Sequence, residues 1–182
     1  WRDSRDRDGK VGAVMSEVVA KRPADFIHYL SQCGSLTPKA FIDEIDNGLM
    51  NLELDSDLAL EAAKQFHRLG SSWSWRTVRL LEKVKPGSCI REAFGLALEY
   101  ARTGSGVSEC HPAEEGKQGE RLHGMAMDSD RGRAIELLRQ LLWADPELLH
   151  DLKPLLPEMM SDPCPAIRTE MASLCYAVAF KE

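Results

Sequence analysis

The sequence predicts an all-α fold: about nine helices in antiparallel pairs, stacked as a short α-solenoid. Apolar residues recur at three- and four-residue spacing along most of the chain, which gives each helix one buried face. No run alternates apolar and polar residues, and no Asn-Gly hairpin signal is present, so we expect no strands. The segments between apolar stripes are mostly a few residues long, and helices joined this way pack as antiparallel neighbours.

Composition narrows the class of protein. The 182 residues are enough for a hydrophobic core, and 43% hydrophobic with 29% charged residues is typical of a soluble globular protein. A net charge of −6 argues against a protein that coats nucleic acid or an acidic membrane as a whole. The charged first ten residues do not form a signal peptide, and no apolar run reaches the ~18 residues that span a bilayer.

The cysteines and the chain ends add two expectations. The chain contains five cysteines, an odd number, and none of them shows CxxC spacing. This pattern favours a protein of the reducing cytoplasm over a secreted protein with a disulfide framework. The chain starts at Trp1 and stops directly after an apolar helical stripe. We therefore expect a fragment of a larger cytoplasmic protein.

The N-terminal half divides into a lead-in and a helical array. Residues 1–9 alternate in charge and bury almost nothing, so we expect a flexible segment. Residues 10–103 carry successive helical stripes separated by proline, glycine and capping residues. The expected helix starts are Pro23, Thr37-Pro38, Asp55, Ser72 and Ser88.

Residues 104–128 predict a mobile, glycine-rich polar loop, which is either disordered or functional. Within it, Cys110, His111 and His123 are potential zinc ligands. Three ligands are too few for a closed structural site, which normally has four. We therefore expect no metal site.

Residues 129–182 contain an internal repeat, in which Asp130-Arg-Gly-Arg-Ala-Ile aligns with Asp162-Pro-Cys-Pro-Ala-Ile. Each aspartate is expected at a helix start, where a carboxylate accepts bonds from free backbone N–H groups. Asp145-Pro146 starts a further helix between the two copies. Pro154 and Pro157 should kink that helix, because proline removes a backbone donor and crowds the preceding turn.

The run Leu155-Leu156-Pro157 … Asp162-Pro163 … Ala166-Ile167-Arg168 resembles HEAT-like repeats. The resemblance covers about the last third of the chain and implies one continuous helical array. It also implies a structural ladder in which Arg168 reaches the turn aspartate, Asp162 or its counterpart Asp130. The segment from Arg131 to Pro146 is loosely similar to helical arrays in large bacterial NTPases, including defence-type sensors.

Charge is unevenly distributed in the first half of the chain. Seven acidic residues and no Lys or Arg lie between Asp43 and Glu61, whereas seven basic residues and one acidic residue lie between Lys64 and Arg91. One interpretation is a basic, aromatic-edged patch for phosphate or an acidic partner. The other, which we favour, is that neighbouring helices offset each other's charge and the tryptophans are core. The candidate patch consists of Arg68, Trp73, Arg76, Arg79 and Lys83.

The sequence contains no nucleophile elbow, zinc-protease, P-loop or dinucleotide-binding motif. We therefore expect no catalytic residues and no cofactor. The expected function is a non-enzymatic recognition or scaffolding segment, which binds a protein through a helical-repeat surface. The alternatives are a nucleic-acid-binding module that uses the basic face around Arg76, or a helical accessory domain of an enzyme. We expect no association with a membrane.

Overall fold

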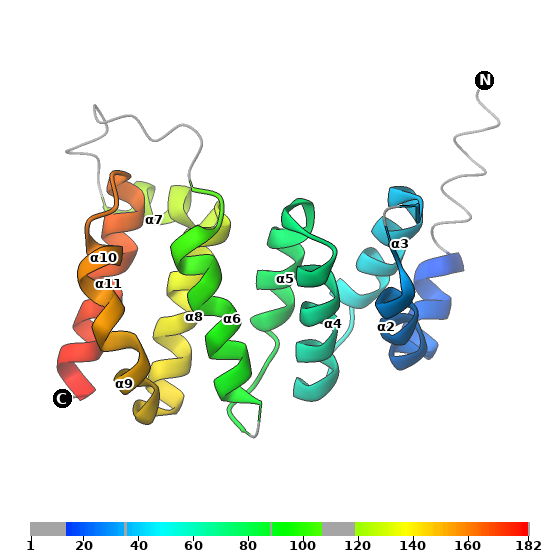
Figure 1. Ribbon diagram of the computed structural model, residues 1–182, viewed down its shortest axis with the longest axis horizontal. Helices are drawn as coiled ribbons and strands as arrows, with labels where there is room; N and C mark the ends of the chain where they lie inside the picture. The colour runs from blue at the N-terminus through cyan, green and yellow to red at the C-terminus, as the bar shows by residue number, and fades with distance from the viewer. Residues whose placement is uncertain (1–13, 35, 88, 107–118, 182) are drawn as a thin grey trace. The chain divides into compact units, whose positions relative to one another are not determined.

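The computed structural model describes residues 14–34, 36–87, 89–106 and 119–181 (Figure 1). The described residues form packed α-helices and short 3-10 turns without any strand, so the predicted all-α class is confirmed. The chain separates into two compact units, Trp1–Lys83 and Val84–Glu182, which we call unit 1 and unit 2. The sequence had predicted one continuous array.

Unit 1 is a packed group of helices with α4 against both α2 and α5. Asp55 was expected to start a helix, and its side chain does accept a hydrogen bond from the Leu58 amide (2.8 Å). The residues of the apolar stripes form the core, with Leu30, Ile45 and Phe66 fully buried. After a helical segment at residues 14–21, the elements are α2 (Pro23–Gln32), α3 (Lys39–Met50), α4 (Ser56–Arg68), η1 (Ser71–Trp73) and α5 (Ser74–Leu81).

Unit 2 contains longer helices and one broken helical segment. The predicted interruption of this helix at its prolines is observed as one break: the segment divides into two short α-helices around Pro154, and Pro157 lies in the first turn of the second. Its elements are α6 (Ile90–Thr103), α7 (Gly119–Met127), α8 (Asp130–Ala144), η3 (Pro146–Leu148), α9 (Leu149–Leu152), η4 (Lys153–Leu155), α10 (Leu156–Met160) and α11 (Pro165–Lys181).

Side-chain pairs fix the directions of these helices. Arg91, near the start of α6, bonds to Glu147 (2.9 Å), and Arg102, near the end of α6, bonds to Glu158 (3.0 Å). The segment η3–α10 therefore runs parallel to α6. In the same way α8 and α11 run parallel, because Trp143 and Phe180, near their C-terminal ends, have ring centroids 5.6 Å apart.

Helix α7 lies inside the range that we expected to be a loop, and this part of the expectation is wrong. It packs on both α8 and α11. The physical reason is a small apolar cluster: Leu122 and Ala126 of α7 are buried against Ala166, with Met125 and Met127 alongside. These apolar residues outweigh the glycines at positions 119 and 124. Residues 107–118 lie outside the described part.

The start of α8 also differs from the expectation. Ser129, and not Asp130, caps the helix, because its Oγ accepts from the Gly132 amide (3.0 Å). Asp130 instead accepts a hydrogen bond from the Ser105 hydroxyl (2.6 Å). Helix α11 begins at Pro165, three residues after Asp162, so the aligned aspartates occupy different positions relative to their helices.

Candidate functional site

One surface of unit 2 combines an open groove with exposed aromatic rings, and we call it the α8–α11 strip. Helices α8 and α11 bury the faces that contain Leu138 and Leu174 and leave the opposite faces outward. Outward residues three or four positions apart on the two parallel helices then form one continuous surface, to which α7 adds a histidine. The strip consists of His123, Glu136, Arg139, Gln140, Trp143, Thr169, Glu170, Ser173, Tyr176 and Phe180.

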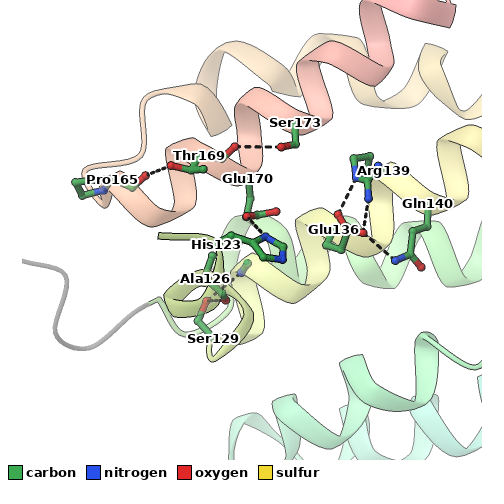
Figure 2. Close-up of polar contacts among 11 residues, drawn as sticks. His123, Ala126, Ser129, Glu136, Arg139, Gln140, Pro165, Thr169, Glu170 and Ser173 are labelled. Carbon is green, nitrogen blue, oxygen red and sulfur yellow. Dashed lines mark hydrogen bonds and ion pairs between the residues drawn. The ribbon is translucent and has the colours of Figure 1, made fainter. Parts of the chain in front are cut away.

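The groove is an open hollow of about 600 Å³ whose lining combines polar side chains with Ala172 and the Tyr176 ring. Figure 2 shows the polar side chains of this lining other than Tyr176, which come from α7, α8 and α11. Its volume lies in the range of ligand-binding sites, ~300–1,000 Å³.

At one end of the groove, His123 of α7 faces Glu170 of α11, with Nδ1 2.6 Å from Oε1 (Figure 2). The Glu170 side chain is only 2% exposed, whereas His123 is about half exposed. A buried carboxylate is costly unless it is hydrogen-bonded. The pair therefore links α7 to α11 at the edge of the groove.

In the middle of the groove, Glu136 accepts hydrogen bonds from Arg139 Nε (2.7 Å) and Nη2 (2.5 Å) and from Gln140 (2.9 Å). Burial raises the pKa of Glu136, but the bonds from Arg139 and Gln140 outweigh burial and hold the pKa below its ordinary value. The bond with Glu136 raises the pKa of Arg139 in turn. Both groups are charged at neutral pH, so the pair presents donors and acceptors without a net charge.

The hydroxyl groups of the groove are bonded to their own helix. Thr169 Oγ1 donates to the Pro165 carbonyl (3.0 Å), and Ser173 Oγ donates to the Thr169 carbonyl (3.5 Å). A general base must lie within hydrogen-bond distance of the proton that it removes. His123 bonds to Glu170 and not to these hydroxyls.

The other end of the strip is an exposed aromatic cluster. Trp143, Tyr176 and Phe180 are 38%, 68% and 67% exposed. The Phe180 ring lies 5.6 Å from that of Trp143 and 6.1 Å from that of Tyr176, and the Lys181 ammonium lies 4.6 Å above Trp143. The sequence analysis did not single out this cluster. The available signal was the aromatic residues on the polar faces of two otherwise amphipathic helices.

Unit 1 contains the candidate basic patch, whose members contact other parts of that unit. Trp73 is only 5% exposed and packs against Phe66, with centroids 5.5 Å apart. Arg76 Nε donates to Asp46 Oδ2 (2.9 Å). Burial raises the pKa of Asp46, and the bond from Arg76 only partly offsets this effect.

The other cations of the patch are also engaged. Arg79 pairs with Glu82 (3.4 Å) on the same side of α5. Lys83 donates to the Met50 and Leu52 carbonyls (3.0 and 2.8 Å), which hydrogen-bonds it to the end of α3. Arg68 donates to carbonyls at the end of α2. These contacts favour the interpretation in which the basic residues hold neighbouring helices together.

The candidate ladder residues meet at one turn, but with different partners from those expected. Arg168 Nη1 donates to the backbone carbonyls of Asp162 (3.0 Å) and Pro163 (2.9 Å). The Asp162 carboxylate pairs with Arg131 and accepts from the Cys164 amide (2.8 Å). Arg131, the residue after Asp130, is therefore the side chain that reaches the turn aspartate, and the sequence analysis missed it.

Only one of the three potential zinc ligands lies among the described residues. Cys110 and His111 lie outside them, and His123 pairs with Glu170. No group of three or more His, Cys, Asp or Glu residues in the described ranges is arranged to hold a metal ion. Within those ranges no helix combines the length and the apolar character required to cross a membrane.

Comparison of the chain with protein-family models, curated proteins and solved structures finds no match.

Proposed function

We propose that this chain is a non-enzymatic recognition segment that binds another protein through the α8–α11 strip. The observation that carries the proposal is the exposed cluster of Trp143, Tyr176 and Phe180. Tryptophan and tyrosine contribute disproportionately to binding energy at protein interfaces, and contiguous exposed apolar patches mark such interfaces. The groove beside the cluster adds hydrogen-bonding groups, which an interface needs around its apolar centre.

The chemistry of the strip indicates the kind of partner. The aromatic end suits an apolar or aromatic anchor side chain. The Glu136–Arg139 pair and Gln140 offer a carboxylate, a guanidinium and an amide to the polar groups of an extended peptide. Because that pair carries no net charge, we expect the anchor side chain to determine affinity.

The arrangement of unit 2 supports a HEAT-like organisation. HEAT-like units alternate a kinked first helix with a straight second helix. In unit 2, α6 and the segment η3–α10 run parallel to one another, as do α8 and α11. In this proposal α8 and α11 are equivalent second helices of adjacent units, and their outward faces form the recognition surface.

A random-peptide library tests the proposal. We expect the full chain to select peptides with an aromatic or aliphatic anchor. Combining Trp143→Ser with Tyr176→Ser should weaken these peptides at least about tenfold, as expected for hot-spot aromatics. Tyr29→Ser is the matched control, because Tyr29 is an exposed aromatic residue of unit 1. Peptides that bind the double variant and the wild type equally well would refute the proposed site.

Nucleic-acid binding through the face around Arg76 is the second candidate. It is favoured by a hollow of about 320 Å³ where Trp75 lies beside Arg76 and the 45% exposed Arg79. Affinity should then fall steeply with salt, because each neutralised phosphate releases counterions. Arg76→Glu combined with Arg79→Glu should abolish binding. Failure of the wild type to bind DNA or RNA at low salt would exclude this function.

A further inference from the structure

A second hollow, of about 430 Å³, lies in unit 1 and is independent of the α8–α11 strip. Its polar wall comes from three places: Thr37 and Lys39 at the start of α3, Arg68 at the end of α4, and Ser72 in η1. Each of these side chains carries a hydrogen-bond donor. Donors from three separate elements therefore line one hollow.

Arg68 is held firmly, but its charge is not matched by an acid. Its Nε donates to Gln65 (3.2 Å), and its Nη2 donates to the carbonyls of Leu30 (2.6 Å) and Cys33 (3.4 Å). A guanidinium has five N–H donors, so the two on Nη1 have no partner among the described residues. Nor does any carboxylate of the described ranges pair with Arg68. The side chain is therefore a preorganised cation with a free donor edge.

The neighbouring groups add further free donors. Thr37 Oγ1 accepts from the Gly34 amide (3.2 Å), which leaves its own hydrogen available. The Ser72 hydroxyl has no partner among the residues that the structure describes. Lys39 donates to both Asp43 oxygens (2.9 and 2.8 Å), and its ammonium also lies 5.0 Å from the centroid of the Trp73 ring at the edge of the hollow. Asp43 pairs with Lys39 and also lies 3.8 Å from Arg76, so the two cations offset its charge.

The backbone adds to the same positive potential. Helix α3 has twelve residues, no acidic residue in its first turn and no side-chain cap. The N-terminus of such a helix presents free N–H groups and the positive end of its dipole. This end carries Lys39, which lines the hollow together with Arg68, so the helix and the side chains favour the same kind of ligand.

We infer that this hollow binds a small organic phosphate. Donors that come from Arg68, Thr37, Ser72 and Lys39 surround a tetrahedral oxyanion better than a planar carboxylate, which accepts bonds in one plane. The hollow also has an apolar wall, to which Ile42 and Trp73 contribute. The oxyanion therefore binds at the donors, and the organic part of the ligand packs against this wall.

A titration of the ¹⁵N-labelled full chain with three anions tests the inference. Phenyl phosphate should shift the amide signals around Thr37 and Ser72 with a saturable curve. Inorganic phosphate should shift the same signals but bind more weakly, because it lacks the apolar body. Benzoate should bind at least about tenfold more weakly than phenyl phosphate, since it leaves charged hydrogen bonds unmade. Equal binding of benzoate, or shifts that never saturate, would overturn the inference.

Four variants locate the site. Ser72→Ala and Lys39→Met remove exposed donors, and each should weaken phenyl phosphate by roughly tenfold. Arg68→Gln should weaken it by about tenfold to a hundredfold. If Arg68→Gln fails to fold, because it also loses the bonds to Leu30 and Cys33, the first two variants decide the question. Arg22→Gln makes the same charge change at an exposed arginine elsewhere in unit 1 and should leave affinity unchanged. An equal loss in Arg22→Gln would show non-specific attraction and refute the site.

Discussion

Gly132→Ala should disrupt the contact between α7 and α8. Gly132 lies in the first turn of α8, directly against the last turn of α7. A Cβ at this position would lie 2.2 Å from the Ala126 carbonyl oxygen, 2.5 Å from its carbon and 2.8 Å from the Ala126 Cβ. Because the two nearest atoms belong to the backbone, no side-chain rotation relieves the clash. The end of α7 must therefore move away from α8.

The expected loss follows from three contributions. Replacing glycine by alanine within a helix gains about 1 kcal/mol, while overpacking a tight contact costs about 1–3 kcal/mol. The Ala126 carbonyl also accepts from the amide (2.9 Å) and the hydroxyl (2.8 Å) of Ser129. Moving this carbonyl costs about 1 kcal/mol for each bond lost. The free energy of unfolding should therefore fall by about 2–4 kcal/mol.

Two other glycines provide matched controls in the same unit. Gly95 of α6 and Gly124 of α7 have open space where a Cβ would lie. Alanine at either position should raise the free energy of unfolding by about 0.5–1 kcal/mol, because only helix propensity changes. Urea unfolding followed by circular dichroism measures all three variants.

Hydrogen exchange distinguishes a local effect from a global one. In Gly132→Ala, the amides of α7 should lose protection before those of α6, since the clash acts on the contact between α7 and α8. If Gly132→Ala is as stable as Gly95→Ala, the close approach of Ala126 to Gly132 is wrong.

The remaining predictions concern charged groups. Arg131→Ala should cost about 3–5 kcal/mol, because it leaves the buried Asp162 carboxylate without its cation; Arg168→Ala should cost only about 1–2 kcal/mol, because it loses bonds to backbone carbonyls. Urea unfolding ranks the two, and equal losses would contradict this difference. The raised pKa of Asp46 means that its protonated form stabilises the fold and that this stabilisation is lost as pH rises through the folded-state pKa. Asp46→Asn should therefore gain stability relative to the wild type between about pH 4 and pH 7. The lowered pKa of Glu136 has the opposite sign, with stabilisation present above the ordinary pKa and lost as pH falls through the folded-state value. Glu136→Gln should therefore lose most, relative to the wild type, at neutral pH, and a pH series of unfolding curves measures both variants.

The helical class was predictable because most helices of the described part carry their own apolar stripe. The break at Pro154 was predictable for a similar reason, since proline acts on its own turn. Helix α7 was not, because its three or four apolar residues favour a helix only when α8 and α11 bury them. The local sequence there is rich in glycine and polar residues, and tertiary packing outweighs it.

The α8–α11 strip could not be predicted from periodicity alone. Trp143, Tyr176 and Phe180 belong to two helices, and only the parallel packing of α8 and α11 brings their rings together. The ion pairs of unit 1 are also non-local: Arg76 and Asp46 are thirty residues apart in the chain. A sequence shows that such residues are basic or acidic but not which partner neutralises each one.

Arg68 and Arg76 show why that distinction matters for function. Both belong to the group of basic residues from Lys64 to Arg91, and both contact distant parts of unit 1. Arg76 is bound to the carboxylate of Asp46, so its charge is largely offset within the fold. Arg68 is bound to uncharged carbonyl and amide oxygens, which orient the guanidinium without cancelling its charge. Charge reversal at Arg76 should therefore act first on stability, because it leaves two like charges in contact. Neutralising Arg68 should weaken anion binding in addition to any effect on stability. Among clustered basic residues, the better candidate for binding an anionic ligand is therefore the cation that is held by neutral groups.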